Sequence, residues 1–389
     1  MKYFSEILKI IDGGLKSDIK KVEDYSVLLA GKLSRDGEII KSERISKILL
    51  KNNCITNNDL IQMSSMNDNN IKQIPYDNES KLELADVIYP KQVEDKKIFL
   101  SNEIKSQIDE FVLSYQNSDK LASYDLDIAA TILLYGPPGC GKTVTALNIA
   151  KKLNLPIVIA RLDTLISSFL GSTAKNIRLL FDFASKIPCV LFLDEFDALA
   201  KQRDDIHEMG ELKRVVNSLL QNIDNLNNKS VLIAATNHSS LLDGAIWRRF
   251  NTRLNIELPD YELVNHYIDY LISEAGHTLD VKVLDFISKL LEGQSLADIE
   301  QIVKRSLRKA VLGDRNVGAA NFVESFFSYI NINLNVPSDS DMTRRNKVKY
   351  LLNVKNDLSN RFLGEVLGCH HNTIKSDKEK IENEVNLNG

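Results

Sequence analysis

The stretch from Gly136 to Thr143, GPPGCGKT, has the residue types and the spacing of a loop that binds polyphosphate. It matches the pattern GxxxxGK followed by Ser or Thr, and it stands between an apolar run, TILLY, and a helical pattern, TVTALNIAKKL. Backbone N–H groups of such a loop can surround phosphate oxygens, and the next helix adds its positive dipole end. We expect Lys142 to reach the β- and γ-phosphates and Thr143 to ligate Mg²⁺. The predicted binding residues are Gly136, Pro137, Pro138, Gly139, Cys140, Gly141, Lys142, Thr143 and Val144.

The alternative for this stretch is a glycine-rich turn without a ligand, which the flanking strand and helix disfavour. Cys140 fills a variable position of the pattern, and we interpret it as a small filler rather than a nucleophile.

A pair of acids, Asp194 and Glu195, follows the apolar run VLFL. Hydrolysis needs, beyond the phosphate loop, a carboxylate near the metal ion and a group that activates water. Since ligands of open α/β sheets bind at the carboxyl ends of the strands, both acids should reach the phosphate site. We expect Asp194 to complete the metal shell and Glu195 to polarise the attacking water; the alternative is a strand end with two solvated acids. ATP and Mg²⁺ are the predicted cofactors, and ATP hydrolysis is the predicted reaction.

Three further residues could complete such a site. Asn237 ends the apolar run SVLIAATN, where its amide could hydrogen-bond the water or the γ-phosphate, although alone it would more often be a turn residue. Arg248 and Arg249 are adjacent. Because Lys142 already serves its own subunit's phosphates, these arginines could stabilise transition-state charge in a neighbouring subunit. The alternative, which composition alone favours, is a surface pair bridged to local acids.

Short apolar runs alternate with helical patterns in the middle of the chain, which predicts a parallel sheet covered by helices on both faces. The expected strands are TILLYG, PIVIA, CVLFLD, SVLIAATN and TRLNIEL, and a helix is expected over 102–115. We predict an α/β fold with helical extensions at both ends. Its parts are a helical docking domain at 1–52, a linker at 53–84, the α/β core at 85–258, a helical segment at 259–332 and a C-terminal helical domain at 342–389.

The 389 residues have an ordinary globular composition, with 43% hydrophobic and 26% charged residues. A net charge of −4 excludes a polycation, so any nucleic-acid contact must be local. The four cysteines form no CxxC pair, which argues against a zinc site or a disulfide framework and suits a reducing compartment. The start, MKYFSEILKI, is amphipathic, and the apolar runs are too short to span a bilayer, so we expect a cytoplasmic protein without membrane contact.

The order of these pieces resembles the AAA ATPases of the AAA+ superfamily over about residues 82–330. The stretches that carry the resemblance are GPPGCGKT, LFLDEFDAL, AATN, LLDGAIWRRF and GQSLADIE. The resemblance implies a P-loop AAA+ core, a small helical lid at 259–332 and a homo-oligomeric ring, usually a hexamer, with ATP between subunits. Arg248 and Arg249 then look like the finger pair of the neighbouring subunit; the family's usual spacer between them is missing, so either could reach the phosphate. Ala297 matches the small residue that related families carry in the lid segment over the nucleotide.

The stretch SSFLGST is similar to the family's pore-facing loop, in which an aromatic residue two positions before the glycine grips the substrate. Phe169 matches that residue, with Leu170 beside it. Polar flanks favour a loop over a pair of core residues; they are Ser167, Ser168, Ser172 and Thr173. The resemblance implies a protein substrate, although nucleic-acid bases also stack on aromatic rings.

The C-terminal stretch DLSNRFLGEVLGCHHNTIKSDKEKI resembles a helix-turn-helix. Gly364 would let two helices approach, Gly368 would take the turn, and Ile374 would pack back. The outward residues of the second helix would be His371, Asn372, Thr373, Lys375 and Ser376. Seven basic residues and two acids lie between residues 342 and 375, a local positive patch of the kind that phosphate contacts require. Residues 342–376 could therefore bind nucleic acid; a helical hairpin for ring assembly or partner docking is the alternative.

Two functions follow from these observations. The first is a ring-forming ATPase that remodels or translocates a protein substrate with Phe169. Its layout is similar to stand-alone bacterial AAA ATPases, some of which work with a partner protease in phage defence. The second is a nucleic-acid-binding switch, in which ATP controls assembly on DNA or RNA through the C-terminal helices.

Overall fold

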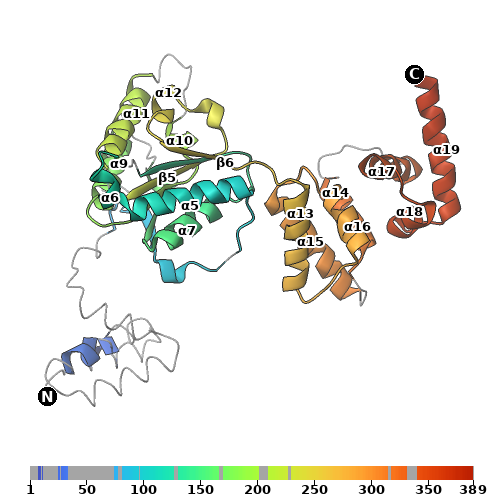
Figure 1. Cartoon of the computed structure of the whole chain (residues 1–389), viewed down its shortest axis with the longest axis horizontal. Coiled ribbons are helices and arrows are strands. Elements are labelled where there is room, and N and C mark those ends of the chain that lie inside the picture. The colour runs from blue at the N-terminus through green and yellow to red at the C-terminus, as the bar shows by residue number, and fades with distance from the viewer. Residues whose placement is uncertain are drawn as a thin grey trace. The chain divides into compact units, whose positions relative to one another are not determined.

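The computed structural model describes residues 8, 9, 11, 25, 26, 28–33, 74–77, 81–95, 97–126, 130–165, 170–200, 209–226, 229–313, 317–330 and 340–388. The chain divides into two compact units, Met1–Gln73 and Ile74–Gly389 (Figure 1). In the first unit residues 28–33 are helical, with Ala30 and Leu33 buried. Most of the predicted docking domain and linker lies outside the described residues.

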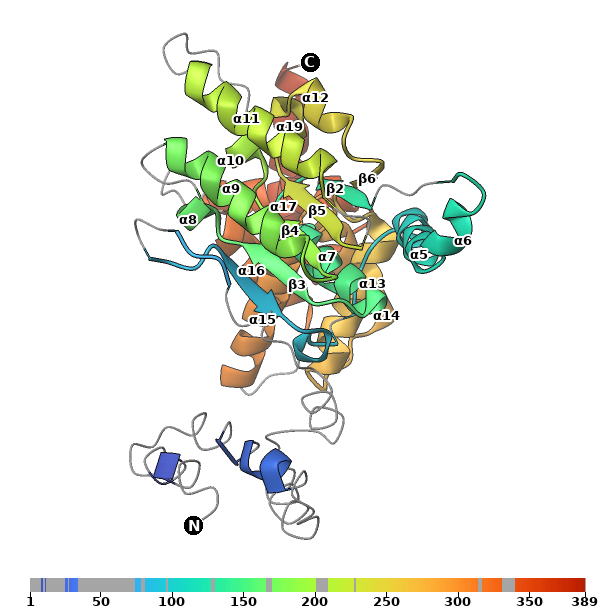
Figure 2. The same cartoon turned by 90° about the vertical axis from the view of Figure 1, so that its left-hand side faces the viewer.

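The second unit contains one six-stranded sheet, which includes all five predicted strands (Figure 2). In chain order the strands are β1 (Ala85–Ile88), β2 (Thr131–Tyr135), β3 (Ile157–Ala160), β4 (Val190–Leu193), β5 (Val231–Thr236) and β6 (Thr252–Asn255). Their order across the sheet is β1-β3-β4-β5-β2-β6, and every pairing is parallel except that of β1 with β3. The sequence did not predict β1, a four-residue edge strand whose side chains are mostly half-buried.

Helices cover both faces of this sheet. They are α5 (Asn102–Gln116), α6 (Ser118–Ala122), α7 (Lys142–Leu153), α8 (Leu162–Leu165), α9 (Leu170–Ala184), α10 (Asp197–Ala200), α11 (Met209–Asp224) and α12 (Gly244–Trp247). Side chains of a strand alternate between the faces, so Ile132 and Leu134 of β2 pack with α5 and α7, whereas Leu133 packs with α9 and α11. Burial on both faces accounts for the uniformly apolar strands.

The chain after Pro259 is helical, as predicted. The helices of the lid are α13 (Tyr261–Glu274), α14 (Val281–Leu290), α15 (Leu296–Leu312) and α16 (Ala319–Ile330). Three of them begin after a capping residue, Asp260, Asp280 or Ser295, whose side-chain oxygen accepts a hydrogen bond from a backbone N–H of the first turn.

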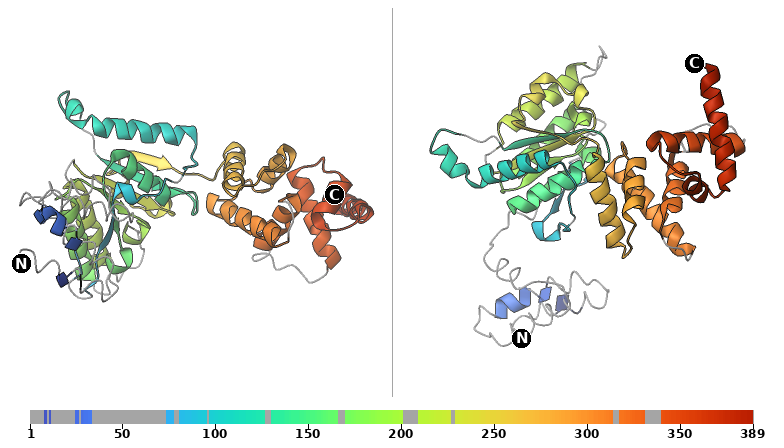
Figure 3. Two further views of the ribbon diagram at one scale, coloured as in Figure 1. Left: turned by 90° about the horizontal axis from the view of Figure 1, so that it is seen from below. Right: turned by 45° about the vertical axis from the view of Figure 1, so that its right-hand side comes forward.

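The C-terminal block packs directly against the lid (Figure 3). Its helices are α17 (Ser340–Val354), α18 (Asn360–Leu367) and α19 (His371–Asn388). Leu351 and Leu363 are fully buried in the same hydrophobic core as Phe322 of the lid. Phe286 of α14 and Phe362 of α18 meet edge to face, with ring centroids 5.0 Å apart. The lid and the C-terminal block therefore share one core, although the sequence between them reads as a linker.

Candidate nucleotide site

The glycine-rich loop joins the end of β2 to the start of α7, as the sequence predicts. Three of its glycines have positive φ, at Gly136, Gly139 and Gly141. A Cβ atom at Gly139 would lie 2.5 Å from Ser295 Oγ and 3.1 Å from Ala297 Cβ. Glycine at this position therefore lets the lid approach the loop backbone, in addition to allowing the left-handed conformation.

Lys142 lies at the first position of α7 with its side chain under the loop. It is 7% exposed, and its ammonium donates hydrogen bonds to the carbonyl oxygens of Gly136 (2.8 Å) and Pro137 (2.7 Å). Burial lowers the pKa of Lys142 from its ordinary value, while the carboxylates of Asp194 and Asp197 act in the opposite direction. The loop carbonyls and two acids that follow β4, Asp194 and Asp197, therefore surround one cationic group, which is the charge that a polyphosphate needs.

Thr143 and Asp194 come together from α7 and the end of β4. The Thr143 hydroxyl donates to Asp194 Oδ2 at 2.8 Å, and both side chains reach solvent. A hydroxyl and a carboxylate are hard oxygen ligands, which suit Mg²⁺ bound by few protein groups together with nucleotide phosphates. The donor set therefore fits the predicted ion. Among the residues that the structure describes, no cluster of three or more His, Cys, Asp or Glu residues could hold a metal.

Glu195 stands in an uncommon backbone conformation, with φ of +47°. Its N–H donates to Asp194 Oδ1 at 2.9 Å, and the next N–H, of Phe196, donates to the Ala235 carbonyl at 2.8 Å. These bonds hold the turn after β4 while the Glu195 side chain remains exposed. Left-handed backbone at a non-glycine residue is a strain that occurs often at functional sites.

Asn237 lies between the phosphate loop and the acid pair, because β5 is the strand between β2 and β4. Its side chain is exposed and makes no hydrogen bond with the described part of the chain. Its neighbour Thr236 is buried and donates to Asp197 Oδ1 at 2.8 Å, while Thr236 Oγ1 accepts from the His238 N–H. The hydrogen bond between Thr236 and Asp197 links the end of β5 to the segment that follows β4, and no motif in the sequence indicated it.

The two adjacent arginines have different surroundings. Arg249 donates from Nε and Nη2 to the two carboxylate oxygens of Asp224, each at 3.1 Å, and from Nη1 to the Ala245 carbonyl at 3.2 Å. The hydrogen bonds to Asp224 raise the pKa of Arg249. Arg248 is exposed and pairs with no described residue. Within one subunit the local-acid interpretation therefore describes Arg249, and Arg248 is the arginine that can act elsewhere.

The start of α15 closes over the phosphate loop. The N–H of Ala297 donates to the Gly139 carbonyl at 3.1 Å. Ser295 Oγ lies 2.6 Å from Asp298 Oδ2, and the Tyr329 hydroxyl of α16 donates to Asp298 Oδ1. That hydrogen bond raises the pKa of Tyr329. The sequence placed Ala297 here, but it gave no sign of Tyr329, which lies more than thirty positions away along the chain.

The structure gives less information about the predicted pore loop and about Cys140. Phe169 lies outside the described residues, and Leu170 begins α9 with its side chain not described. Ser172 and Thr173 belong to the first turn of α9, so the loop predicted for these two residues is wrong. The helix includes them because Thr173 lies on its buried face, which continues through Asn176, Ile177 and Leu180. Burial raises the pKa of the Cys140 thiol, which suits a filler.

Comparisons with known proteins agree with this geometry. Residues 132–258 match the family described as "ATPase family associated with various cellular activities (AAA)". The chain contains an AAA ATPase domain. Over 204 residues the chain is 44% identical to an uncharacterized AAA family ATPase, y4kL, of Sinorhizobium fredii. This match covers 52% of this chain and 61% of that protein.

More distant relatives of the AAA domain have other names. A putative 26S proteasome regulatory subunit homolog of Methanocaldococcus jannaschii is 34% identical over 189 residues, 48% of this chain and 51% of that protein. An ATP-dependent zinc metalloprotease FtsH of Lancefieldella parvula is 32% identical over 242 residues, 59% of this chain and 37% of that protein. The chain thus spans about a third to three fifths of these relatives.

A solved structure, the crystal structure of the FIGL-1 AAA domain, confirms the predicted α/β fold of the AAA+ core. It superposes with a TM-score of 0.53 at 24% identity, and the match covers 74% of this chain and 96% of that one. Among the described residues, none of the helices combines the length and apolarity needed to cross a membrane.

Proposed function

We propose that this protein hydrolyses ATP in a ring of identical subunits and uses the energy to remodel or translocate a protein substrate. The observation that carries the proposal is the meeting of Lys142, Thr143, Asp194 and Glu195 at the carboxyl edge of the sheet, where AAA domains bind ATP. Relatives named as a proteasome regulatory subunit homolog and as FtsH support a protein substrate.

Each residue of this edge has a chemical role in the proposal. The Lys142 ammonium binds the β- and γ-phosphates, and Thr143 and Asp194 would hold Mg²⁺, which neutralises phosphate charge when bound. The Glu195 carboxylate orients the attacking water and accepts its proton. The Asn237 amide, one strand away, hydrogen-bonds that water or the γ-phosphate.

An arginine of the adjacent subunit completes the site in this proposal, and we assign that role to Arg248. Arg249 is held by Asp224 and the Ala245 carbonyl, so it fixes the end of α12 from which Arg248 projects. A guanidinium brought in from a neighbour would stabilise charge on the transferred phosphate. A ring, in the family usually of six subunits, supplies that neighbour at every site.

Replacing Glu195 with Gln tests the hydrolytic assignment, because the carboxamide cannot accept a proton. We expect the variant to bind ATP with unchanged affinity and to lose turnover by at least about a hundredfold. The matched control is Glu110→Gln, on the exposed surface of α5, which should keep the native rate. Native turnover by the Glu195 variant would remove this residue from the reaction.

The protein-substrate part of the proposal rests on Phe169. Its ring would grip an extended polypeptide in the pore, so Phe169→Ala should stop unfolding of a fluorescent protein client while ATP turnover continues. The layout of the chain further supports work with a partner protease in phage defence. Phage plating on cells that carry the protein with its genomic neighbours, with Glu195→Gln as the inactive form, tests that role; equal plating with both forms would contradict it.

A second candidate function is an ATP-controlled switch that binds nucleic acid, and it is favoured by the packing of α18 on α19. A Cβ atom at Gly364 would lie 2.7 Å from the Cys369 carbonyl oxygen, Gly368 has φ of +68°, and Ile374 is fully buried. This packing supports the roles that the resemblance to a helix-turn-helix predicts for the three positions. Retention of the full chain on duplex DNA, compared with single-stranded RNA at a fixed salt concentration, tests this function.

A further inference from the structure

The surface that α19 leaves open is polar. In the first half of α19, over residues 371–379, His371, Asn372, Lys375 and Ser376 are exposed. Of the two acids in this half, Asp377 is buried and paired with Arg344 at 2.7 Å, and Glu379 is exposed. The Arg344–Asp377 pair thus removes a negative charge from the surface and fixes α19 on α17.

Two basic side chains of this block, Lys375 of α19 and Arg361 of α18, are exposed and form no hydrogen bond or ion pair with the described residues. Lys378 of α19, by contrast, donates to the Leu358 carbonyl at 2.9 Å. The imidazole of His370 accepts from the Asn372 N–H at 3.3 Å, which starts the helix and leaves the Asn372 side chain outside. Exposed lysine, arginine and asparagine are the side chains that bind phosphates and base edges.

Apolar anchors for a protein partner are scarce on this block. Among its described side chains the only large exposed hydrophobic one is Tyr350, on α17. Docking of an amphipathic helix or another protein face needs buried aromatic or aliphatic anchors. The polarity of the face and the scarcity of apolar anchors therefore favour nucleic acid over a protein partner.

We propose that the first half of α19, with Arg361 of α18, binds the major groove of duplex DNA. The proposal rests on the second candidate function and specifies its surface: Lys375 and Arg361 contact phosphates, and Asn372 reaches a base edge. A second helix packed on the first through Gly364 has the geometry that places such residues in the groove.

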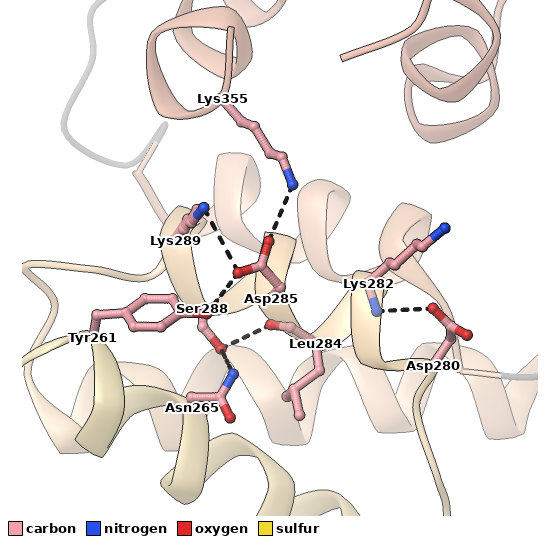
Figure 4. Close-up of polar contacts among 9 residues, drawn as sticks. All are labelled: Tyr261, Asn265, Asp280, Lys282, Leu284, Asp285, Ser288, Lys289 and Lys355. Atoms are coloured by element: carbon pink, nitrogen blue, oxygen red, sulfur yellow. Dashed lines mark hydrogen bonds and ion pairs between the residues drawn. The ribbon is translucent and has the colours of Figure 1, made fainter. Parts of the chain in front are cut away.

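The lid makes this face dependent on nucleotide. Asp285 of α14 accepts from Lys355 at the end of α17 (3.1 Å) and from the Tyr261 hydroxyl at the start of α13 (2.6 Å), with Lys289 at 3.7 Å (Figure 4). With the shared apolar core, this joint makes the C-terminal block move with the lid. Since Ala297 of the lid contacts the phosphate loop, a nucleotide that changes this contact also changes how α19 is presented.

The experiment is DNA binding by the full chain, measured by fluorescence anisotropy with a labelled random 30-base-pair duplex across a salt series. Arg361→Ala with Lys375→Ala should weaken affinity about tenfold or more and reduce the slope of log affinity against log salt by about 2. Lys282→Ala, an exposed lysine of the lid, is the control and should change neither. All three side chains are exposed, so thermal unfolding should be unaltered.

Nucleotide dependence is measured on the Glu195→Gln form with ATP, with ADP and without nucleotide. The affinity for DNA should differ by at least about fivefold between states, and DNA should change the affinity for ATP by the same factor. Lys355→Met should shrink that factor.

The possible results distinguish failure of the switch function from failure of the surface and the lid role proposed for it. No DNA binding by the wild-type chain at low salt overturns the switch function itself. Binding that the Arg361 and Lys375 changes leave intact overturns the assigned surface while the switch stands. Equal affinity in all nucleotide states overturns the role of the lid.

Discussion

The nucleotide edge of the sheet and the core shared by the lid and the C-terminal block are built in opposite ways. The edge is assembled from polar groups on short turns, such as the Thr143–Asp194 bond and the Glu195 turn. The shared core is assembled from fully buried side chains, including Leu351 and Leu363, that come from distant parts of the chain. Local motifs identify the residues of the edge, although packing must bring Thr143 and Asp194 together across 51 positions of the chain, whereas no local motif identifies the residues that meet in the shared core. Changes at the edge should therefore alter rates, and changes in the shared core should alter stability.

The largest effect should come from Arg248→Ala, which removes the arginine proposed to act on a neighbour's nucleotide. We expect turnover to fall about a thousandfold with little change in thermal stability, because the side chain has no partner among the described residues. Arg249→Ala breaks the ion pair with Asp224, which is partly exposed and should contribute little to stability. Its turnover should fall by less than about tenfold. Equal losses in steady-state ATPase assays would contradict the assignment.

The second effect concerns the phosphate loop and the lid. Gly139→Ala places a methyl group against Ser295 Oγ at a residue with φ of +75°. Because the lid must then move away from the loop, KM for ATP should rise about tenfold, with a smaller change in kcat. Gly276→Ala, also at φ of +75° but with open space around it, is the control for backbone strain alone. A similar KM in both variants would show that the lid contact does not contribute to binding.

The third effect tests whether the C-terminal block shares the lid's core. Leu363→Ala removes a fully buried side chain and should lower the unfolding free energy by about 3 kcal/mol. Leu113→Ala, at a side chain that is 62% exposed, should cost little. If the core is shared, calorimetry should show the lid and the block unfolding together. A separate early transition for the block would contradict the common core.

The smallest effect is a pH dependence at Asp285. The hydrogen bond from Tyr261, with Lys355 and Lys289 nearby, lowers the pKa of Asp285 in the folded chain. A lowered folded pKa adds stability above the unfolded value, near 3.9, and that stability is lost as the pH falls through the folded pKa. Below about pH 4 the melting temperature of the wild type should approach that of Asp285→Asn. Parallel melting curves from pH 7 to pH 3 would contradict this role.

The same contrast explains which features of the fold and of the site could be predicted from the sequence. The five parallel strands and the positions of Lys142, Thr143 and Asp194 could be predicted, because each depends on a local pattern of apolar residues and turns. The partner of Arg249 could not be predicted, since Asp224 lies in another helix and only packing brings it near. The same holds for the Tyr329–Asp298 bond.

The start of α9 and the C-terminal block show a second limit of prediction from the sequence. Polar Ser172 and Thr173 suggested a loop, but helical packing takes up both residues and buries Thr173. The polar stretch before α17 suggested a linker between the lid and a C-terminal helical domain, but the apolar faces of α17 and α18 pack against the lid. Composition indicates where a chain is polar; it does not indicate which apolar faces meet.

The most direct test of the account mixes two inactive forms. Glu195→Gln subunits keep Arg248 but lack the base, and Arg248→Ala subunits keep the base but lack the arginine. If each ATP site is completed by the adjacent copy, dissociating and reassembling the two forms together should restore ATP hydrolysis that neither form shows alone. Mixed assemblies that remain inactive, or Arg248→Ala subunits that hydrolyse ATP at the native rate, would contradict the shared site.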